Sequence, residues 1–258
     1  TSSITIWKIN DNQIIQLKII FTFAFLRLSL IINSLDFIIS KQFQSGNFPC
    51  TCNEKDDPNK TKLVLSLFYK ERLILSRAMY GVMSELEFYK KYNKKAPFIV
   101  ELKYAFQDKL ACYEIKECLE GGNLRYYMNK HLINEAKAKF LAANIILALE
   151  FIHDCGYVHR DIRPENILIN KTGYAKINDL KFMRETSKIT FCESSGTPGY
   201  MAPEILFRQP HGTAADIFSL GVILYELYVG QPPFYTNSFP TLIWAFLISC
   251  LTTVSASP

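Results

Sequence analysis

The residues best suited to chemistry lie in one short string, His159 to Asn166, which reads HRDIRPEN. A carboxylate at Asp161 and an amide at Asn166, five residues further on, suit phosphoryl transfer. The acid can orient an acceptor hydroxyl while the amide holds a metal ion. Arg163 lies between them and can steady a phosphate, and Asp179 offers a second metal ligand. This spacing indicates a site for metal-bridged phosphates.

The elements that must position these residues fall into two groups, separated by Gly121 and Gly122. Before the glycines, the hydrophobic pattern predicts strands at 63–68, 99–106 and 110–115 and a helix at 79–92. After them, it predicts helices at 136–154 and 214–228 and one hairpin that joins 167–170 to 174–178. We therefore expect an α+β chain with a small, mostly β lobe followed by a helical lobe.

Composition limits the class of protein. The chain has 258 residues, of which 49% are hydrophobic and 21% charged, as is typical of globular proteins. A net charge of +5 without a basic stripe gives no indication of nucleic-acid binding. The seven cysteines form no zinc-binding pattern, and we expect free thiols in a reducing, cytoplasmic compartment. No secretory leader is recognisable at the start of the chain.

Two apolar stretches are too short to span a membrane, which takes about 20 apolar residues. Residues 19–26 lie between Lys18 and Arg27, and the dense part of the uncharged end of the chain is Leu242 to Leu251. We expect both stretches to be buried helices and the chain to have no membrane span.

Five strings together resemble the eukaryotic protein kinases, in the AGC group and most closely the cyclic-GMP-dependent kinases. They are HRDIRPEN, TGYAKIND at 172–179, TFC at 190–192, GTPGYMAPE at 196–204 and DIFSLGVILYELYVGQPPF at 216–234. The resemblance covers about residues 37–236. It implies a two-lobed kinase fold, with an N-lobe antiparallel sheet and one helix at 37–118 and an incomplete helical C-lobe at 119–258.

Residues 1–36 precede the region of resemblance. Within them, Ile4 to Ile15 is similar to the last strand and following helix of a cyclic-nucleotide-binding domain. A helix that simply packs against the rest of the chain is the alternative.

The resemblance assigns a role to each residue of the catalytic string. It implies that Asp161 is the catalytic base, that Asn166 and Asp179 bind Mg²⁺, and that Arg163 replaces the usual catalytic-loop lysine. Asp216 is expected to brace this loop from within the core.

The resemblance also implies roles around the activation segment. Arg160 is expected to read a phosphate on Thr190, and Thr197 to steady the catalytic acid. Glu204 normally pairs with an arginine near the end of the domain, which this chain does not reach, so the domain is expected to be truncated.

The expected ATP contacts are Gly46, Phe48, Glu117 and Cys118, but the phosphate-binding parts depart from the family pattern. The glycine-rich loop keeps only Gly46 and contains Pro49, and Lys181 replaces the glycine that follows Asp179 and Leu180.

Ser66 stands where the family has its phosphate-binding lysine. Lys62 and Lys70 flank this position. Lys116 occupies the gatekeeper position; its side chain could reach inwards in place of the missing lysine, but we expect it to reach outwards to solvent. Glu85, or on loop length alone Glu87, is expected to be the helical acid, left without its lysine partner.

Two functions follow from this mixture of kept and lost residues. One is ATP-dependent phosphorylation of protein serine or threonine, weakened by the losses; the other is a pseudokinase that acts as a non-catalytic binding scaffold. Glu165 and Glu226 imply a protein substrate with basic residues near the acceptor, with reduced selectivity because Asn123 replaces the third acid.

Overall fold

The computed structural model describes residues 2–10, 13–21, 47–48, 62–76, 78–188 and 196–234. The chain divides into two compact units. The first comprises residues 1–95 and 100–118, and the second comprises residues 96–99 and 119–258.

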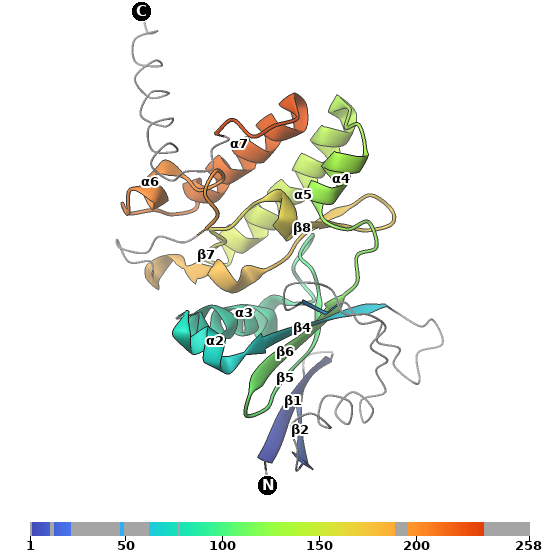
Figure 1. Ribbon diagram of the computed structural model, residues 1–258, viewed down its shortest axis with the longest axis vertical. Coiled ribbons are helices and arrows are strands. Elements are labelled where there is room, and N and C mark those ends of the chain that lie inside the picture. The colour runs from blue at the N-terminus through green and yellow to red at the C-terminus, as the bar shows by residue number, and fades with distance from the viewer. Residues whose placement is uncertain are drawn as a thin grey trace, which may run out of the picture. The chain divides into compact units, whose positions relative to one another are not determined.

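A six-stranded antiparallel sheet forms the first unit, with strand order β2-β1-β5-β6-β4-β3 (Figure 1). Its strands are β1 (Ser2–Asn10), β2 (Gln13–Phe21), β3 (Asn47–Phe48), β4 (Leu63–Tyr69), β5 (Leu102–Gln107) and β6 (Ala111–Glu117). The register of β4 against β6 places Ser66 opposite Glu114 and Val64 opposite Lys116. Directly opposed residues point to the same face of an antiparallel pair, so these four share one face.

Two helices accompany this sheet, α2 (Lys70–Leu75) and α3 (Met79–Tyr92). The buried side of α3 includes Val82, Glu85, Phe88 and Tyr89, at the three- and four-residue spacing of one helix face. Glu85 is therefore a carboxylate among apolar neighbours and is fully buried. The helix predicted at 79–92 and the strands predicted in this unit are confirmed, whereas the short helix α2 was not foreseen.

The helix expected within residues 4–15, and the buried helix expected at 19–26, are wrong where the chain is described. Residues 13–21 form strand β2, which pairs with β1 along its length, with Ile4 opposite Ile19. Strand β1 also pairs with β5, so this hairpin extends the sheet of the first unit. Isoleucine is branched at Cβ and favours extended backbone, and the sheet satisfies the backbone hydrogen bonds that a helix would have made internally.

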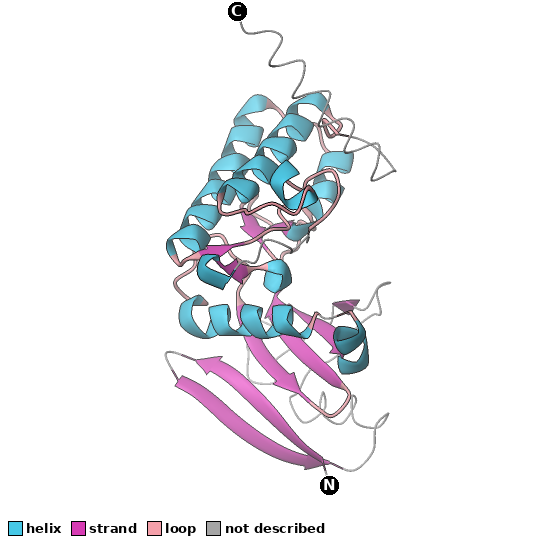
Figure 2. Ribbon diagram, turned by 90° about the vertical axis from the view of Figure 1, so that its left-hand side faces the viewer, coloured by secondary structure: helices cyan, strands magenta, loops and turns pink. Residues whose placement is uncertain are grey.

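The second unit is mainly helical (Figure 2). Its α-helices are α4 (Leu124–Lys130), α5 (Glu135–Asp154), α6 (Pro203–Leu206) and α7 (Ala214–Val229). Its strands pair as β8 (Ile167–Ile169) with β9 (Ala175–Ile177) and β7 (Tyr157–Val158) with β10 (Arg184–Glu185). Short 3-10 turns lie at η1 (Pro164–Asn166), η2 (Leu180–Phe182) and η3 (Thr186–Lys188).

Local sequence accounts for the limits of α5, the central helix of this unit. The Asn134 side chain accepts a hydrogen bond from the Lys137 amide at 3.0 Å, which caps the first turn. Gly156 follows the last turn with φ of 79°, a left-handed backbone that glycine adopts without strain. Between these ends, α5 buries a row of apolar side chains against the core, comprising Leu141, Ile145, Leu149 and Ile152. The helix thereby supports the strands and loops that carry the catalytic string.

Within the described ranges, no helix is both long enough and apolar enough to cross a bilayer. The helix expected at 242–251 lies outside these ranges.

Candidate active site

Asp161 is held by two side chains from different parts of the second unit. The Thr197 hydroxyl donates to Asp161 Oδ1 at 2.7 Å, and Asn166 Nδ2 donates to Oδ2 at 2.7 Å. The same amide also donates to the Asp161 main-chain carbonyl at 2.9 Å, and Asp161 is 4% exposed. A carboxylate offers about four acceptor positions, so two bonds fix its orientation and still leave capacity for a hydroxyl proton.

Asp216, the buried acid at the start of α7, fixes the backbone just before Asp161. Its two oxygens accept hydrogen bonds from the His159 and Arg160 amides, both at 2.8 Å, and His153 Nε2 lies 2.8 Å from Oδ2. Arg160 has φ of 71°, a left-handed conformation that costs a non-glycine residue about 1–3 kcal/mol. The Asp216 carboxylate offsets this cost, because it satisfies the two amides that the unusual backbone presents.

Gly196 closes this part of the site from the opposite side. A Cβ atom at this position would lie 2.6 Å from the Arg160 carbonyl oxygen, and Gly196 has φ of 123°. Only glycine permits such an approach. The contact places Thr197, the next residue, within reach of Asp161.

Asp179 forms an ion pair with Lys181, which the sequence indicated only as the replacement of a glycine. Lys181 Nζ lies 2.7 Å from Asp179 Oδ1, and both side chains are about one-quarter exposed. Asp179 itself has left-handed backbone, with φ of 60°, while Leu180 between the two is fully buried. The expected metal ligand is therefore neutralised from within the chain.

Asn166 and Asp179 have the oxygen donors that Mg²⁺ prefers, and a backbone hydrogen bond of 2.8 Å from Asn178 to Asn166 links the segments that carry them. The amide carbonyl of Asn166 takes no part in its bonds to Asp161. Among the described residues, no group of three histidine, cysteine, aspartate or glutamate side chains could hold a metal alone. The donor set therefore fits an ion that also binds phosphate oxygens, provided that Lys181 releases Asp179.

Arg163 lies beside Asp161, the expected catalytic residue, as its place in the string suggests. Its Nε is 3.4 Å from Asp161 Oδ2, and about one-third of its side chain is exposed. It thus lies at the border between the buried carboxylate and solvent.

A second buried charge cluster lies in the first unit, around Lys116 of β6. Lys116 Nζ lies 2.6 Å from Glu85 Oε1 and 3.1 Å from Glu114 Oε2, and it lies over the Tyr89 ring at 5.4 Å. Lys116 is 6% exposed, and both glutamates are at most 1% exposed. Burial alone would lower the pKa of Lys116, but the two carboxylates raise it well above its ordinary value.

Two expectations are corrected here. Lys116 does not reach outwards, and Glu85 is not without a lysine partner. The reason is alternation along β6, which puts Lys116 on the same face as Glu114 and towards Glu85 on α3. Glu87, the other candidate for the helical acid, is exposed.

The remaining lysines near Ser66 point elsewhere. Lys70 Nζ donates to the Asp108 carbonyl at 2.5 Å, and Lys62 is exposed. Ser66 itself is half-buried on the face that carries Lys116. The cation nearest in role to the missing lysine is thus Lys116, from a different strand.

Of the other predicted nucleotide contacts, the structure describes the side chains or backbone bonds of two. Glu117 accepts a hydrogen bond from the Glu101 amide at 2.8 Å, and the Cys118 amide donates to the Lys62 carbonyl at 3.2 Å. Phe48 lies in β3, whose side chains are not described, and Gly46 lies outside the described residues.

Of Thr190 and Glu204, two activation-segment residues that were assigned roles, the structure describes only one. Thr190 lies outside the described residues, while Glu204 is half-buried in α6. Arg160, the expected reader of a phosphate on Thr190, donates from Nε to the Phe182 carbonyl at 2.9 Å.

Comparison with known proteins assigns the family. The model of the protein kinase domain matches residues 40–251. The chain belongs to the protein kinase family. The two-lobed α+β kinase fold accordingly applies to it.

The curated relatives of this kinase domain include serine/threonine kinases of the AGC group. A probable serine/threonine-protein kinase of Dictyostelium discoideum is 34% identical over 81% of this chain and 46% of its own length. The cAMP-dependent protein kinase catalytic subunit of Schizosaccharomyces pombe is 33% identical over 79% of this chain and 40% of its own. Human serine/threonine-protein kinase Sgk1 is 32% identical over 79% and 48%. The chain thus spans less than half the length of these relatives.

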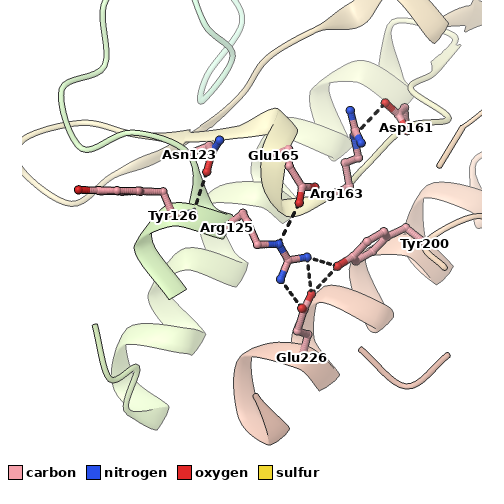
Figure 3. A network of polar contacts seen from close by, with 8 residues as sticks. All are labelled: Asn123, Arg125, Tyr126, Asp161, Arg163, Glu165, Tyr200 and Glu226. Carbon is pink, nitrogen blue, oxygen red and sulfur yellow. Dashed lines mark hydrogen bonds and ion pairs between the residues drawn. The ribbon is translucent and has the colours of Figure 1, made fainter. Parts of the chain in front are cut away.

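One further cluster was missed from the sequence, and Figure 3 shows it beside the catalytic loop of the kinase domain. Arg125, near the start of α4, contacts Glu165 of η1, Glu226 of α7 and the Tyr200 hydroxyl. Glu165 and Glu226 are the acids that suggested a basic substrate. An arginine from the chain itself joins them here.

Proposed function

We propose that this domain transfers the γ-phosphoryl group of ATP to serine or threonine residues of proteins, at a reduced rate. The observation that carries the proposal is the Asp161 carboxylate, oriented by Thr197 and Asn166 and supported by Asp216. These contacts bring the expected catalytic residues together in a buried, hydrogen-bonded arrangement. Such an arrangement fits the positioning on which phosphoryl transfer depends.

The proposed roles follow the geometry within the second unit. Asp161 would accept the proton of the acceptor hydroxyl, since its two existing bonds fix the carboxylate without filling it. Asn166 and Asp179 would hold Mg²⁺, which neutralises phosphate charge when it is bound. Arg163, at the solvent border, would face the transferred group.

The reduced rate follows from two features. Lys181 competes for Asp179, and Ser66 supplies no cation to the phosphates. Loss of one positioned electrostatic donor typically lowers turnover about 10²- to 10³-fold. Lys116 does not restore this donor, because its ammonium group is already bound by two buried carboxylates.

Several finer assignments belong to the same proposal. We propose that the domain is of the cyclic-GMP-dependent kinase type, that Thr190 is a phosphorylation site read by Arg160, and that Glu204 is a structural residue of the domain. Residues 1–36 are proposed as a pre-kinase segment, 37–118 as the N-lobe and 119–258 as the C-lobe. The Cys112 thiol forms no disulfide, which supports a cytoplasmic location.

The test is phosphate transfer from radiolabelled ATP to a degenerate mixture of serine and threonine peptides. We expect incorporation by the wild type, and a loss of about 10²- to 10⁴-fold in Asp161→Asn, the range typical of a general base. Asp154→Asn, an exposed aspartate on α5, is the matched control. Equal incorporation by the wild type and Asp161→Asn would contradict the proposal.

A non-catalytic scaffold is the second candidate, and the Lys181–Asp179 ion pair favours it. A chain that neutralises its own metal ligand with a lysine needs no metal ion to balance that charge. Absence of incorporation in the same assay, together with an intact fold, would support this function instead.

A further inference from the structure

We infer that Arg125 is a specificity-determining residue: it occupies the acidic subsite formed by Glu165, Glu226 and Tyr200 and so removes selection for an arginine in the substrate. The inference rests on the proposed function, because it concerns the peptide presented to Asp161. It differs from the sequence expectation, in which the same acids select a basic peptide.

Four contacts fix the Arg125 guanidinium (Figure 3). Nε donates to Glu165 Oε1 at 2.8 Å, and Nη2 donates to Glu226 Oε2 at 3.2 Å. Nη1 also donates to Glu226, and Nη2 to the Tyr200 hydroxyl. That hydroxyl in turn donates to Glu226 Oε2 at 2.5 Å. All three nitrogens of the guanidinium therefore donate hydrogen bonds, as the planar arginine fork favours with carboxylates.

The electrostatics of the cluster favour a tightly held cation. Burial alone would lower the pKa of Arg125, but the hydrogen bonds that it donates to Glu226 and Glu165 raise it above its ordinary value. Burial and the hydrogen bond to Glu226 raise the pKa of Tyr200, so the phenol stays neutral. The Glu226 side chain is 1% exposed, and such a buried carboxylate requires a cation or donors close by.

The backbone holds Arg125 in place before any ligand arrives. Asn123 caps α4 by accepting a hydrogen bond from the Tyr126 amide at 2.8 Å. Leu124, just before Arg125, is fully buried. Asn123, which stands where the third acid was expected, thus caps the helix and helps to position Arg125.

The cluster lies close to where an acceptor must bind. Glu165 follows Asp161 by four residues, a span of at most about 14 Å in extended chain. A peptide that presents a hydroxyl to Asp161 therefore brings its neighbouring residues to these acids. An arginine in that peptide must displace Arg125, whose tethering to the same chain corresponds to a local concentration on the order of millimolar or more.

Peptide binding tests this inference without requiring catalysis. Two fluorescein-labelled peptides are compared by anisotropy, one with arginines at two and three residues before the acceptor serine and one with glutamines there. The variants are Arg125→Leu and, as a matched loss of charge on the same helix, Lys130→Leu; Lys130 is exposed.

We expect wild type and Lys130→Leu to bind the two peptides within about twofold of each other, as for a solvent-exposed charge. Arg125→Leu should bind the arginine peptide about tenfold more tightly than the glutamine peptide, because a charged hydrogen-bonded pair becomes available to it. Adding Glu226→Gln to Arg125→Leu should abolish that gain.

A preference of about tenfold for the arginine peptide in the wild type would overturn the inference without any variant. So would a folded Arg125→Leu that gains no preference. Thermal melting checks the fold, and Arg125→Gln, which keeps donors to both acids, replaces Arg125→Leu if the latter melts early. Failure of phosphate transfer in the earlier assay leaves these binding outcomes unaffected, so the two proposals fail separately.

Discussion

The cluster around Asp161 and the cluster around Lys116 both provide partners for buried carboxylates. They differ in how closely those partners match the residue types of the kinase pattern. Asp161 keeps partners of the residue types that the kinase pattern leads one to expect, Asn166 and Thr197. Glu85 instead receives its cation from β6, because β4 offers only Ser66 at the usual position. A contact can thus be retained while the residue that supplied it is replaced.

The difference follows from what each cluster requires. The bonds around Asp161 depend on strained local backbone at Arg160 and on glycine at Gly196, so few alternatives exist. An ion pair to Glu85 needs only a long cation on the sheet face that α3 covers. Lys116 meets that structural requirement, with an ammonium group that two buried carboxylates already bind.

Removal of the substituted cation should have the largest effect. Lys116→Met leaves two buried carboxylates without their ammonium partner, and we expect a loss of about 3–5 kcal/mol in the free energy of unfolding. Urea denaturation measures it. Lys103→Met, which breaks a partly exposed pair with Glu101, should cost less than about 1 kcal/mol. Equal losses in the two variants would show that Lys116 has no special structural role.

The Lys181–Asp179 pair allows the comparison to be tested at the proposed metal site. Lys181→Gln removes the competing charge, and we expect Mg²⁺-dependent ATP binding to tighten about tenfold by isothermal titration. Asp179→Asn should abolish metal-dependent binding, whereas Lys171→Gln, in the exposed β8–β9 turn, should not change it. Identical ATP affinity in Mg²⁺ and in EDTA for every protein would contradict a metal-centred site.

Restoration of the missing lysine should have a smaller effect. In Ser66→Lys the new side chain lies opposite Glu114, which can hold it without disturbing the Lys116–Glu85 pair. Because this carboxylate competes with phosphate, we expect only about a threefold gain in ATP affinity. Ser66→Met, of similar length without charge, is the control and should give no gain.

The smallest change is expected with pH. The pKa of Lys116 lies well above 10.5 in the folded protein, so its stabilisation is fully present below that pH and is lost only as pH rises through the folded value. The difference in unfolding free energy between wild type and Lys116→Met should therefore not decline as pH rises from about 7 to 10. A decline across that range would place the folded pKa too low for this ion-pair assignment.

The sequence predicted the long elements well. Periodicity located α3, α5, α7 and the β8–β9 hairpin within one or two residues, because their buried faces repeat at regular spacing. Residues 13–21 were misassigned because the pairing partner of an isoleucine-rich strand, not its own pattern, decides its structure.

The expected catalytic residues were named by resemblance, and the structure places Asn166 against Asp161 and Asp216 against the backbone just before it. Lys116, Lys181 and Arg125 were missed or misjudged, since the direction of a long side chain depends on partners distant in sequence. The strand pattern could have indicated the position of Lys116, because Glu114 and Lys116 are two residues apart in β6 and so share the sheet face of Ser66. For Arg125, the corresponding indication was that Glu165 and Glu226 had no cation assigned to them within the chain.

The bonds from Asp216 to His159 and Arg160 also set an order of assembly. They span 57 and 56 residues, so the carboxylate that holds the left-handed backbone at Arg160 is synthesised well after the segment it holds. On the ribosome, which adds about 5–20 residues per second, the catalytic string waits several seconds for its support. This string therefore reaches its folded conformation late, only when α7 has left the exit tunnel and packed against α5.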